Sequence, residues 1–410
     1  MELISTNNIA KICRCGNTGF TQKDLAALFM ANTRNEIDQV RRYMEYGLQK
    51  SKASPIILLA KWYRKNNVMT GSVRNLMSKQ LVYSEFGDPI QVLKVREIEV
   101  PKLGTQDVLV RMLAAPINPA DINTIQGKNI KPPRLPAIPG DEGVGEITEM
   151  GKHVSCVALG DRVVLASRQL GSWRYYGVFN QRDVHVIAKN LAIPEASMLT
   201  VAPCSAYRLL NDFKKVKPGE TVLQNGANSP VGQSVIQLCK AKGINTFNIV
   251  ASHCGYETVK AHLLKLGATT VYTLEEAEAL TSFDTSLARP TLGLNCLGGR
   301  FEDVMLKLLA RSGVIVYYGF AYFLPMSKQF TRCDVDFYKF NMQNWEACAT
   351  SVEKDIMYKQ IIQHMIIGDF IAPTHVPIEL NDYILALRNT VHSEAFSTFN
   401  YVFDFTLPCS

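Results

Sequence analysis

The sequence lacks the paired cysteines that build zinc ribbons and secreted disulfide frameworks. Its ten cysteines are scattered over 410 residues, only Cys13 and Cys15 lie close together, and no CxxC pair occurs. We therefore expect a protein of a reducing compartment that has no cysteine-based metal site and no disulfide scaffold.

Long apolar runs are also missing. The longest candidate, residues 55–60, is far shorter than the roughly 18–20 residues of a membrane-spanning helix, so no membrane span is expected. The composition, 47% hydrophobic and 20% charged, is that of an ordinary globular protein and excludes collagen-like and disordered classes. At about 100–200 residues per domain, the chain has room for roughly two domains.

Acidic residues are scarce in only one part of the chain. Residues 1–80 hold 13 Lys/Arg and 5 Asp/Glu, a net charge of +8, and the rest of the chain is nearly neutral at −1. Because the positive charge is confined to this part, the body of the protein lacks the charge of a nucleic-acid binder, and no nucleic-acid partner is expected.

The basic segment, residues 1–75, has the composition of a mitochondrial transit segment, because it is poor in acids and contains Ser, Thr and Asn. Between residues 21 and 50, apolar side chains recur at near-helical spacing after Thr21, a suitable N-cap. We expect a protein of the mitochondrial matrix. Two alternatives stay open: a cytoplasmic protein whose extension or helix binds a partner, and a true start at Met69.

Two kinds of pattern follow the basic segment. Short apolar segments separated by Gly and Pro predict a small antiparallel β domain, and from about residue 196 strands and helices alternate. This alternation predicts right-handed βαβ units around a parallel sheet. The predicted strands are 80–83, 107–113, 160–165, 220–224 and 245–250, and the predicted helices are 206–213, 231–242 and 255–266.

The turn between the strand at 220–224 and the following helix has the sequence QNGANSPVGQS. A dinucleotide fold needs small residues here, so that the backbone can approach the pyrophosphate and the helix amides can face it. The strict GxGxxG pattern is absent, and Pro230 stands where glycine is usual, although proline fits a first helical turn. The spacing alone fits either a nucleotide cradle or a tight structural turn.

Later strand ends carry further signals. Residues 250–253 contain no Asp or Glu for a ribose 2′-hydroxyl, which disfavours NAD, and no Arg or Lys that would argue for NADP. Segments 294–299 and 313–320 read as strands that end on Gly-containing loops. Such strand ends line the ligand crevice of an open parallel sheet, although two ordinary core strands give the same pattern.

Several segments together carry a resemblance to a known family. They are AAPINPADIN at 114–123, IQG at 125–127, LPAIPG at 135–140, GSW at 171–173, PCSAYR at 203–208, and the segments 225–237 and 294–299. From about residue 81 to 403, roughly four-fifths of the chain, the sequence resembles the medium-chain dehydrogenase/reductase superfamily. Within that superfamily it is most similar to the mitochondrial trans-2-enoyl-thioester reductases.

The resemblance implies an α/β fold made of a GroES-like β domain and a Rossmann-type doubly wound parallel sheet. The implied domains are the basic extension at 1–75, the first part of the GroES-like catalytic domain at 76–205, the Rossmann-type NADP-binding domain at 206–345, and a return to the catalytic domain at 346–410. It also implies a homodimer.

The activity that the resemblance implies is NADPH-dependent reduction of a trans-2-enoyl thioester of CoA or acyl carrier protein in mitochondrial fatty acid synthesis. Hydride would reach the β-carbon, and hydrogen-bond donors would stabilise the thioester enolate before protonation at the α-carbon. The positions implied to contact the cofactor are Asn228, Ser229, Pro230 and Val231 at the pyrophosphate, Ser252 and His253 at the 2′-phosphate, Tyr318, Gly319, Phe320 and Ala321 on the nicotinamide side, and Gln343, Asn344 and Trp345 on a later strand.

The sequence departs from the family pattern at four places in the implied crevice. Asn129 stands where the family has its Tyr proton donor, and an amide cannot donate a proton at neutral pH. Residues 251–253 replace an Arg-containing segment, Ala202 replaces an Asn, and a Lys is replaced near Phe399. These departures leave open an altered cofactor, an altered substrate or a loss of activity.

Two further interpretations concern acids and metals. Tyr175 and Tyr176 could replace the missing donor, but packing or surface roles are favoured for both. The zinc-dependent members carry a Gly-His-Glu motif and a four-Cys lobe, whereas this chain has Gly140-Asp141-Glu142 and no four-Cys cluster, so no metal is expected.

Two functions remain as alternatives to the reductase. One is an enone reductase that resembles quinone oxidoreductases, and the other is a catalytically silent paralogue that keeps the scaffold.

Overall fold

The structure is a computed structural model of the chain. It describes residues 76–129, 132–252, 255–280, 287–324, 334–391 and 399–407. These residues belong to one unit, Leu76–Ser410, and the expected basic extension at 1–75 lies outside the described residues. Within the described residues, no helix is both long enough and apolar enough to cross a bilayer.

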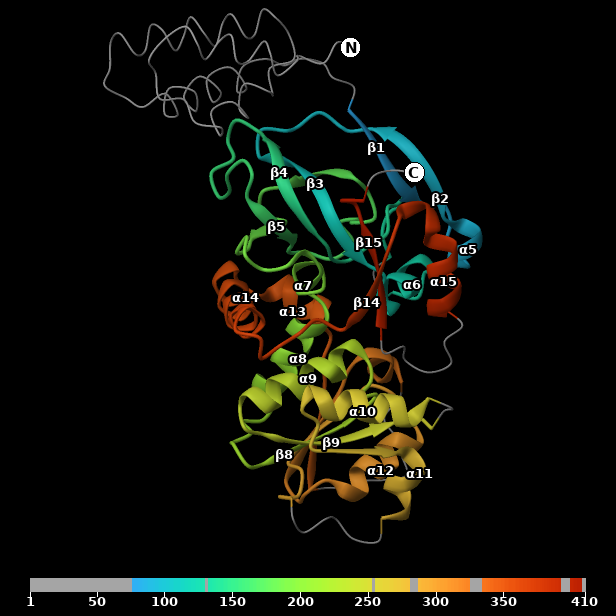
Figure 1. The fold of residues 1–410 in the computed structure, drawn as a ribbon, viewed down its shortest axis with the longest axis vertical. Helices are drawn as coiled ribbons and strands as arrows, with labels where there is room; N and C mark the ends of the chain where they lie inside the picture. Colours follow the sequence, from blue (N-terminus) through green and yellow to red (C-terminus); the bar gives the residue numbers. More distant parts are fainter. Residues whose placement is uncertain are drawn as a thin grey trace, which may run out of the picture. The chain divides into compact units, whose positions relative to one another are not determined.

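A mixed, largely antiparallel sheet forms the upper half of the described unit in Figure 1. Its order is β14-β15-β3-β4-β5-β7, and β6 also pairs with β3. The C-terminal strand β15 pairs antiparallel with β3, so the end of the chain returns to the sheet that its first third began. The strands are β3 (Asp107–Pro116), β4 (Val144–Met150), β5 (Arg162–Leu165), β6 (Tyr176–Asn180), β7 (Val184–Val186), β14 (Thr374–Ile378) and β15 (Phe399–Asp404).

A two-stranded antiparallel sheet and several short helices complete this half. Asp88 caps the first short helix by accepting a hydrogen bond from the backbone N–H of Ile90, and Pro89 occupies its first turn. The elements are β1 (Met77–Val82), β2 (Lys94–Glu99), α5 (Pro89–Val92), α6 (Pro119–Ile125), α7 (Ile193–Ser197), η2 (Leu380–Asp382) and α15 (Tyr383–Val391).

The second sheet has six parallel strands, in the order β10-β9-β8-β11-β12-β13. The chain therefore starts in the middle, moves to one edge, and then crosses back to build the other edge. The strands are β8 (Thr221–Asn225), β9 (Asn245–Val250), β10 (Thr270–Thr273), β11 (Leu292–Asn295), β12 (Gly313–Tyr317) and β13 (Val335–Lys339). Strands β8, β11 and β12 are buried along their whole length, as expected where helices cover both faces.

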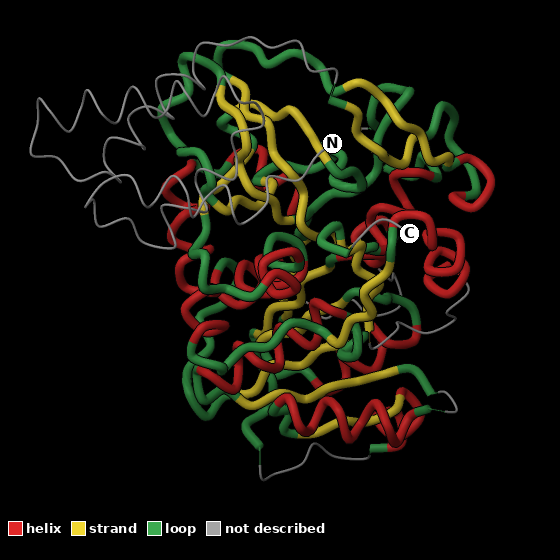
Figure 2. Tube along the Cα trace, turned by 45° about the horizontal axis from the view of Figure 1, so that its top comes forward, coloured by secondary structure: helices red, strands yellow, loops and turns green. Residues whose placement is uncertain are grey.

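Helices lie on both faces of this parallel sheet, as Figures 1 and 2 show. They are α8 (Ala202–Asn211), α9 (Pro230–Ala241), α10 (Tyr256–Leu266), α11 (Leu274–Ala279) and α12 (Arg300–Leu308), and the 3₁₀ turn η1 (Gly319–Phe323) follows β12. Helices α13 (Met342–Cys348) and α14 (Ser351–Ile366) lie beside α7 in Figure 1, and Lys354 of α14 donates to the Ala166 carbonyl of the upper half. Helix α14 begins with a capping box, in which Thr350 and Glu353 satisfy each other's backbone N–H groups.

The strands and helices expected from the sequence are confirmed to within a few residues, with two corrections. The helix expected at 206–213 begins earlier, at Ala202, because Pro203 fits its first turn and does not break it. The strand expected to carry Gln343, Asn344 and Trp345 is a helix, α13, which Asn341 caps through its side chain.

One hydrophobic core joins the two sheets. It contains side chains of the upper sheet, such as Leu113 and Val144, together with Val222 and Leu294 of the parallel sheet. The upper sheet also has a core of its own, in which Trp173 is fully buried. The Trp173 indole packs edge-on against the Phe403 ring at 5.3 Å and donates a 3.1 Å hydrogen bond to the Pro116 carbonyl.

We expect Trp173→Ala to lower the free energy of unfolding by about 3–5 kcal/mol, because the change leaves a large cavity and an unsatisfied carbonyl between β3 and β15. Urea denaturation followed by far-UV circular dichroism measures this loss. The exposed Met77, changed to Ala, is the control and should alter stability by no more than about 0.5 kcal/mol. Similar unfolding midpoints for both variants would contradict this account of the core.

Candidate active site

The strand order of the parallel sheet reverses between β8 and β11, which are neighbours although β9 and β10 lie between them in sequence. In open parallel sheets such a reversal opens a ligand crevice at the carboxyl ends of the strands. Two buried amides mark this point: Asn225 ends β8 and donates a 2.7 Å hydrogen bond to Asn295, which ends β11. The Asn225 side-chain oxygen accepts the backbone N–H of Cys296 at 2.8 Å.

The turn after β8 is tightly built. Gly226 has a φ of +58°, and Ser229 caps α9 by accepting the backbone N–H of Gly232 at 3.1 Å. Pro230 and Val231 form the first turn of α9, and Asn228 is buried. A Cβ on Gly232 would lie 2.6 Å from the Ala227 Cα, so only glycine lets the helix approach this closely. Small residues and the N-terminus of a 12-residue helix suit a pyrophosphate.

The other expected cofactor positions are spread around the same edge of the sheet. Ser252 follows β9 and is exposed, and His253 lies outside the described residues. Tyr318 continues β12, where its backbone N–H donates to the Asn295 carbonyl at 3.0 Å. Burial and the neighbouring Cys296 raise the pKa of the Tyr318 phenol well above its ordinary value, so this side chain stays neutral.

The 3₁₀ turn η1 carries the expected nicotinamide-side residues. Ala321 is buried and its backbone N–H donates to the Cys296 carbonyl at 2.9 Å, whereas the Phe320 side chain is 63% exposed. Gly319 has a φ of +56°, which turns the chain directly after β12. The end of β11 and this turn are thus held to each other by backbone hydrogen bonds.

Helix α13 lies beside that turn. The Asn344 side chain donates to the Tyr322 hydroxyl at 3.3 Å, so one expected residue reaches η1. Trp345 instead packs under the Arg208 guanidinium, 4.6 Å from its ring centroid, and Gln343 is half-buried. The structure therefore brings Asn344 to the expected nicotinamide side and turns Trp345 toward helix α8.

Asn129 follows helix α6 in the upper half. Its side-chain amide donates a 2.6 Å hydrogen bond to the Thr124 hydroxyl, which in turn donates to the Ala120 carbonyl. An amide in this position can hold an oxygen but cannot supply a proton. Tyr175, considered as a replacement donor, stacks edge-on against Phe405 at 5.1 Å, which agrees with the packing role favoured from the sequence.

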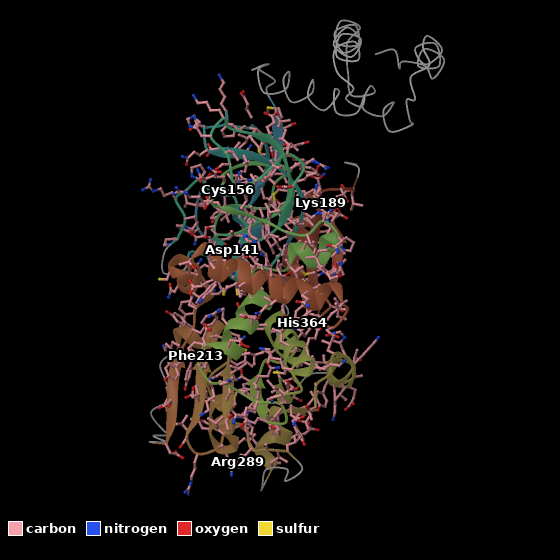
Figure 3. The ribbon with its side chains drawn as sticks, turned by 90° about the vertical axis from the view of Figure 1, so that its left-hand side faces the viewer. Asp141, Cys156, Lys189, Phe213, Arg289 and His364 are labelled. Atoms are coloured by element: carbon pink, nitrogen blue, oxygen red, sulfur yellow. The ribbon has the colours of Figure 1, made fainter. Side chains whose placement is uncertain are left out.

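A buried polar cluster between α6 and the crevice was missed by sequence reasoning. Glu142 accepts three hydrogen bonds, from the Asn118 amide at 2.9 Å, the Thr200 hydroxyl at 3.1 Å and the Val201 backbone at 2.8 Å. Asp121 accepts the backbone N–H groups of Asn118 and Asp141. In Figure 3, Asp141 lies near the middle of the described unit, whereas Arg289 lies at its far end.

Arg168 is the arginine that interacts with this cluster of acids. Arg168 forms a two-pronged ion pair with Glu346, with both N–O distances at 2.8 Å, and donates to the Thr200 carbonyl at 2.9 Å. The two side chains are only 7% and 6% exposed. They are 178 residues apart in sequence, and no local pattern signals that they meet.

Burial sets the protonation of these acids. It raises the pKa of Glu142 to about 7, against the opposing effects of Arg168 and the three donors. Burial also raises the pKa of Asp121, which the neighbouring Asp141 raises further, and that of Glu346, although Arg168 opposes the latter. Within the described residues, no group of three His, Cys, Asp or Glu side chains could hold a metal ion.

The raised pKa of Glu142 predicts a pH-dependent stability. Between the ordinary value of 4.5 and about 7, the folded protein binds more protons at this site than the unfolded chain, so stability is lost as the pH rises through this window. We expect Glu142→Gln to remove this component, which amounts to roughly 3 kcal/mol. Urea denaturation of both proteins from pH 5 to pH 8 measures it.

The control for this experiment is Glu146→Gln, which removes a carboxylate that is 41% exposed and paired with Arg111 on the sheet surface. Parallel stability profiles for wild type and Glu142→Gln would show that Glu142 does not carry the pH dependence.

Known proteins share this architecture. Residues 104–199 match the family model of the alcohol dehydrogenase GroES-like domain, which confirms the expected fold class together with the parallel sheet. Two solved structures, each covering 80% of this chain and 100% of theirs at a TM-score of 0.71, have the same fold. They are Etr1p in complex with NADP and crotonyl-CoA, 22% identical, and the mitochondrial 2-enoyl thioester reductase Etr1p/Etr2p heterodimer from Candida tropicalis, 23% identical.

The sequence is also similar to characterised proteins over most of its length. It is 35% identical over 315 residues to the mitochondrial enoyl-[acyl-carrier-protein] reductase of Bos taurus, a match that covers 76% of this chain and 84% of that protein. The identity and the coverage of the relative confirm the resemblance drawn from the sequence motifs. The chain belongs to the family of mitochondrial enoyl-[acyl-carrier-protein] reductases.

Proposed function

We propose that this protein reduces trans-2-enoyl thioesters of CoA or acyl carrier protein with NADPH, in mitochondrial fatty acid synthesis. The observation that carries the proposal is the tight turn at Gly226–Gly232, built at the strand-order reversal of a chain that belongs to this family. The complex of Etr1p with NADP and crotonyl-CoA, which has the same fold, supports both the cofactor and the substrate class.

The chain's own residues divide the binding of the cofactor. Residues 228–231 are assigned to the pyrophosphate at the first turn of α9, Ser252 and His253 to the 2′-phosphate, and Tyr318–Ala321 to the nicotinamide side. Gln343 and Asn344 of α13 are assigned beside that turn, whereas Trp345 packs against Arg208 and is not assigned to the cofactor. NADPH bound there supplies the hydride for the β-carbon of the enoyl group. Zinc has no part in the proposal, which needs hydrogen-bond donors alone at the thioester oxygen.

Asn129 takes the place of the missing phenol in a limited sense. One of its amide N–H groups holds Thr124, and the second can hold the thioester oxygen as negative charge develops on it. The proton for the α-carbon then comes from solvent. A basic patch of Lys128, Lys131 and Arg134 would attract the phosphates of CoA or an acidic carrier protein. Lys128 and Arg134 are exposed, and Lys131 lies outside the described residues.

We infer the location and the oligomeric state of the protein from its relatives. A mitochondrial matrix location is supported by the name of the bovine enzyme and by the acid-poor composition of residues 1–75. The paired subunits of the Candida tropicalis Etr1p/Etr2p heterodimer support a dimer, and we propose that two copies of this chain form it.

The test is NADPH oxidation by the full chain with trans-2-hexenoyl-CoA, with NADH and with a simple quinone in parallel. Turnover that depends on the thioester and is faster with NADPH supports the proposal. Turnover on the quinone alone would favour the enone-reductase alternative, and a folded protein that binds NADPH without turning over would favour the silent paralogue.

Replacing Asn129 tests the assignment of the proton donor. We expect Asn129→Tyr to raise turnover of trans-2-hexenoyl-CoA by at least about tenfold, because a positioned general acid contributes roughly 10²–10⁴-fold. Asn129→Phe adds the same ring without the hydroxyl and is the matched control, so it should not share the gain. Equal rates in the two variants would show that position 129 does not face the α-carbon.

Replacing Gly232 tests whether the turn Gly226–Gly232 binds the cofactor. We expect Gly232→Ala to weaken NADPH binding by at least about tenfold, because its Cβ would clash with backbone atoms of Ala227 at 2.6–2.7 Å. Fluorescence titration with NADPH measures the affinity. Gly293→Ala is the matched control in the same sheet, since a Cβ there meets only side-chain atoms at 3.4 Å or more. Unchanged affinity in folded Gly232→Ala would remove the turn from the binding site.

A further inference from the structure

The buried ion pair between Arg168 and Glu346 joins the two halves of the crevice. Arg168 lies in the loop between β5 and β6 of the upper sheet, and Glu346 lies on α13, directly after the last strand of the parallel sheet. We propose that this pair is a latch, meaning an ion pair between the β5–β6 loop and helix α13 that fixes helix α6 relative to helix α13, and that both residues are positioning residues for the reduction. The inference rests on the proposed function.

A continuous chain of hydrogen bonds connects the latch to α6. Arg168 donates to the Thr200 carbonyl at 2.9 Å, and the Thr200 hydroxyl donates to Glu142 at 3.1 Å. Glu142 accepts the side-chain amide of Asn118, which caps α6, at 2.9 Å. Helix α6 carries Thr124, whose hydroxyl accepts from Asn129. Each link between the latch and α6 is within hydrogen-bond distance.

The other end of the latch reaches the cofactor side. Glu346 shares α13 with Asn344, whose side chain donates to Tyr322 in the turn η1. The same turn contains the residues proposed to line the nicotinamide side. The latch therefore lies between the group proposed to hold the thioester oxygen and the segment proposed to face the hydride donor, whose separation must be right for transfer.

The charge and burial of the Arg168–Glu346 pair indicate that it fixes the geometry of the site rather than stabilising the fold. Asp141, Glu142 and Glu346 interact with Arg168, and burial makes the charged forms of Glu142 and Glu346 costly. A buried ion pair gives little net stability over apolar residues of the same size, but a two-pronged Arg–carboxylate pair fixes distance and orientation. A fixed geometry is what the groups on the two sides of a crevice require.

The kinetic test uses Glu346→Gln and Arg168→Lys in the full chain. Glu346→Gln removes the charge at nearly constant volume, and Arg168→Lys keeps the charge but loses the two-pronged contact. We expect kcat for trans-2-hexenoyl-CoA to fall at least tenfold in each folded variant, with the NADPH dissociation constant within about threefold of wild type. The double variant should be no slower than the worse single variant.

The matched control is the pair of Arg300 and Glu278, which is also two-pronged but sits on the surface between α11 and α12. Glu278→Gln and Arg300→Lys should leave kcat within twofold of wild type. A purely structural role for the latch would instead lower the unfolding midpoint and the folded fraction, without changing kcat per folded molecule. That outcome overturns the proposal.

Hydrogen–deuterium exchange separates the latch from the proposed reaction. In Glu346→Gln, peptides that cover α6 and α13 should exchange faster together, while those of β8 and β9 keep the wild-type rate. Faster exchange in α13 alone, or uniformly along the chain, overturns the latch. If the wild-type protein reduces no enoyl thioester, the proposed function fails, but this measurement still decides whether the pair couples the two helices. Should Glu346→Gln not fold, Arg168→Lys gives the same comparison.

Discussion

The reversal of strand order between β8 and β11 is the constraint on which the rest of the site depends. At this point the chain has built three strands toward one edge and returns to build three toward the other, so two strand ends open side by side without a connection across them. A direct side-chain hydrogen bond joins Asn225 and Asn295 at the base of that opening. The turn after β8 and the backbone contacts of η1 are arranged around this base.

The upper half of the structure contributes helix α6 to the site. Helix α6 and its capping residue Asn118 come from the upper half, and the C-terminal strand β15 returns to pair with β3 beside them. A hydrophobic core shared by both sheets holds the halves together without fixing how their polar groups face each other. Buried hydrogen bonds and bidentate ion pairs fix the orientation of these polar groups, because such contacts are directional.

The chain belongs to the reductase family, and Asn129 stands where the resemblance leads us to expect a proton-donating Tyr. The Asn129 amide donates to the Thr124 hydroxyl, and we propose that its second N–H is the hydrogen-bond donor at this position. Donation to an enolate oxygen and protonation of carbon are separate tasks, and only the second needs an acid. In the proposed function, Asn129 therefore keeps the electrostatic part of the family's chemistry, and the proton comes from solvent.

The sequence by itself determined the elements and the family. Alternating segments predicted the strands at 220–224 and 245–250 and the helices at 231–242 and 255–266, because periodicity and turn residues are local properties. The strand predicted at residues 343–345 was wrong, because this short segment shows no clear period and the side-chain cap at Asn341 starts a helix. Only the tertiary structure decided that Arg168 meets Glu346 and that Glu142 binds Asn118 and Thr200. Such contacts join segments as far as 178 residues apart, and burial gives them their strength, so no local pattern could have predicted them.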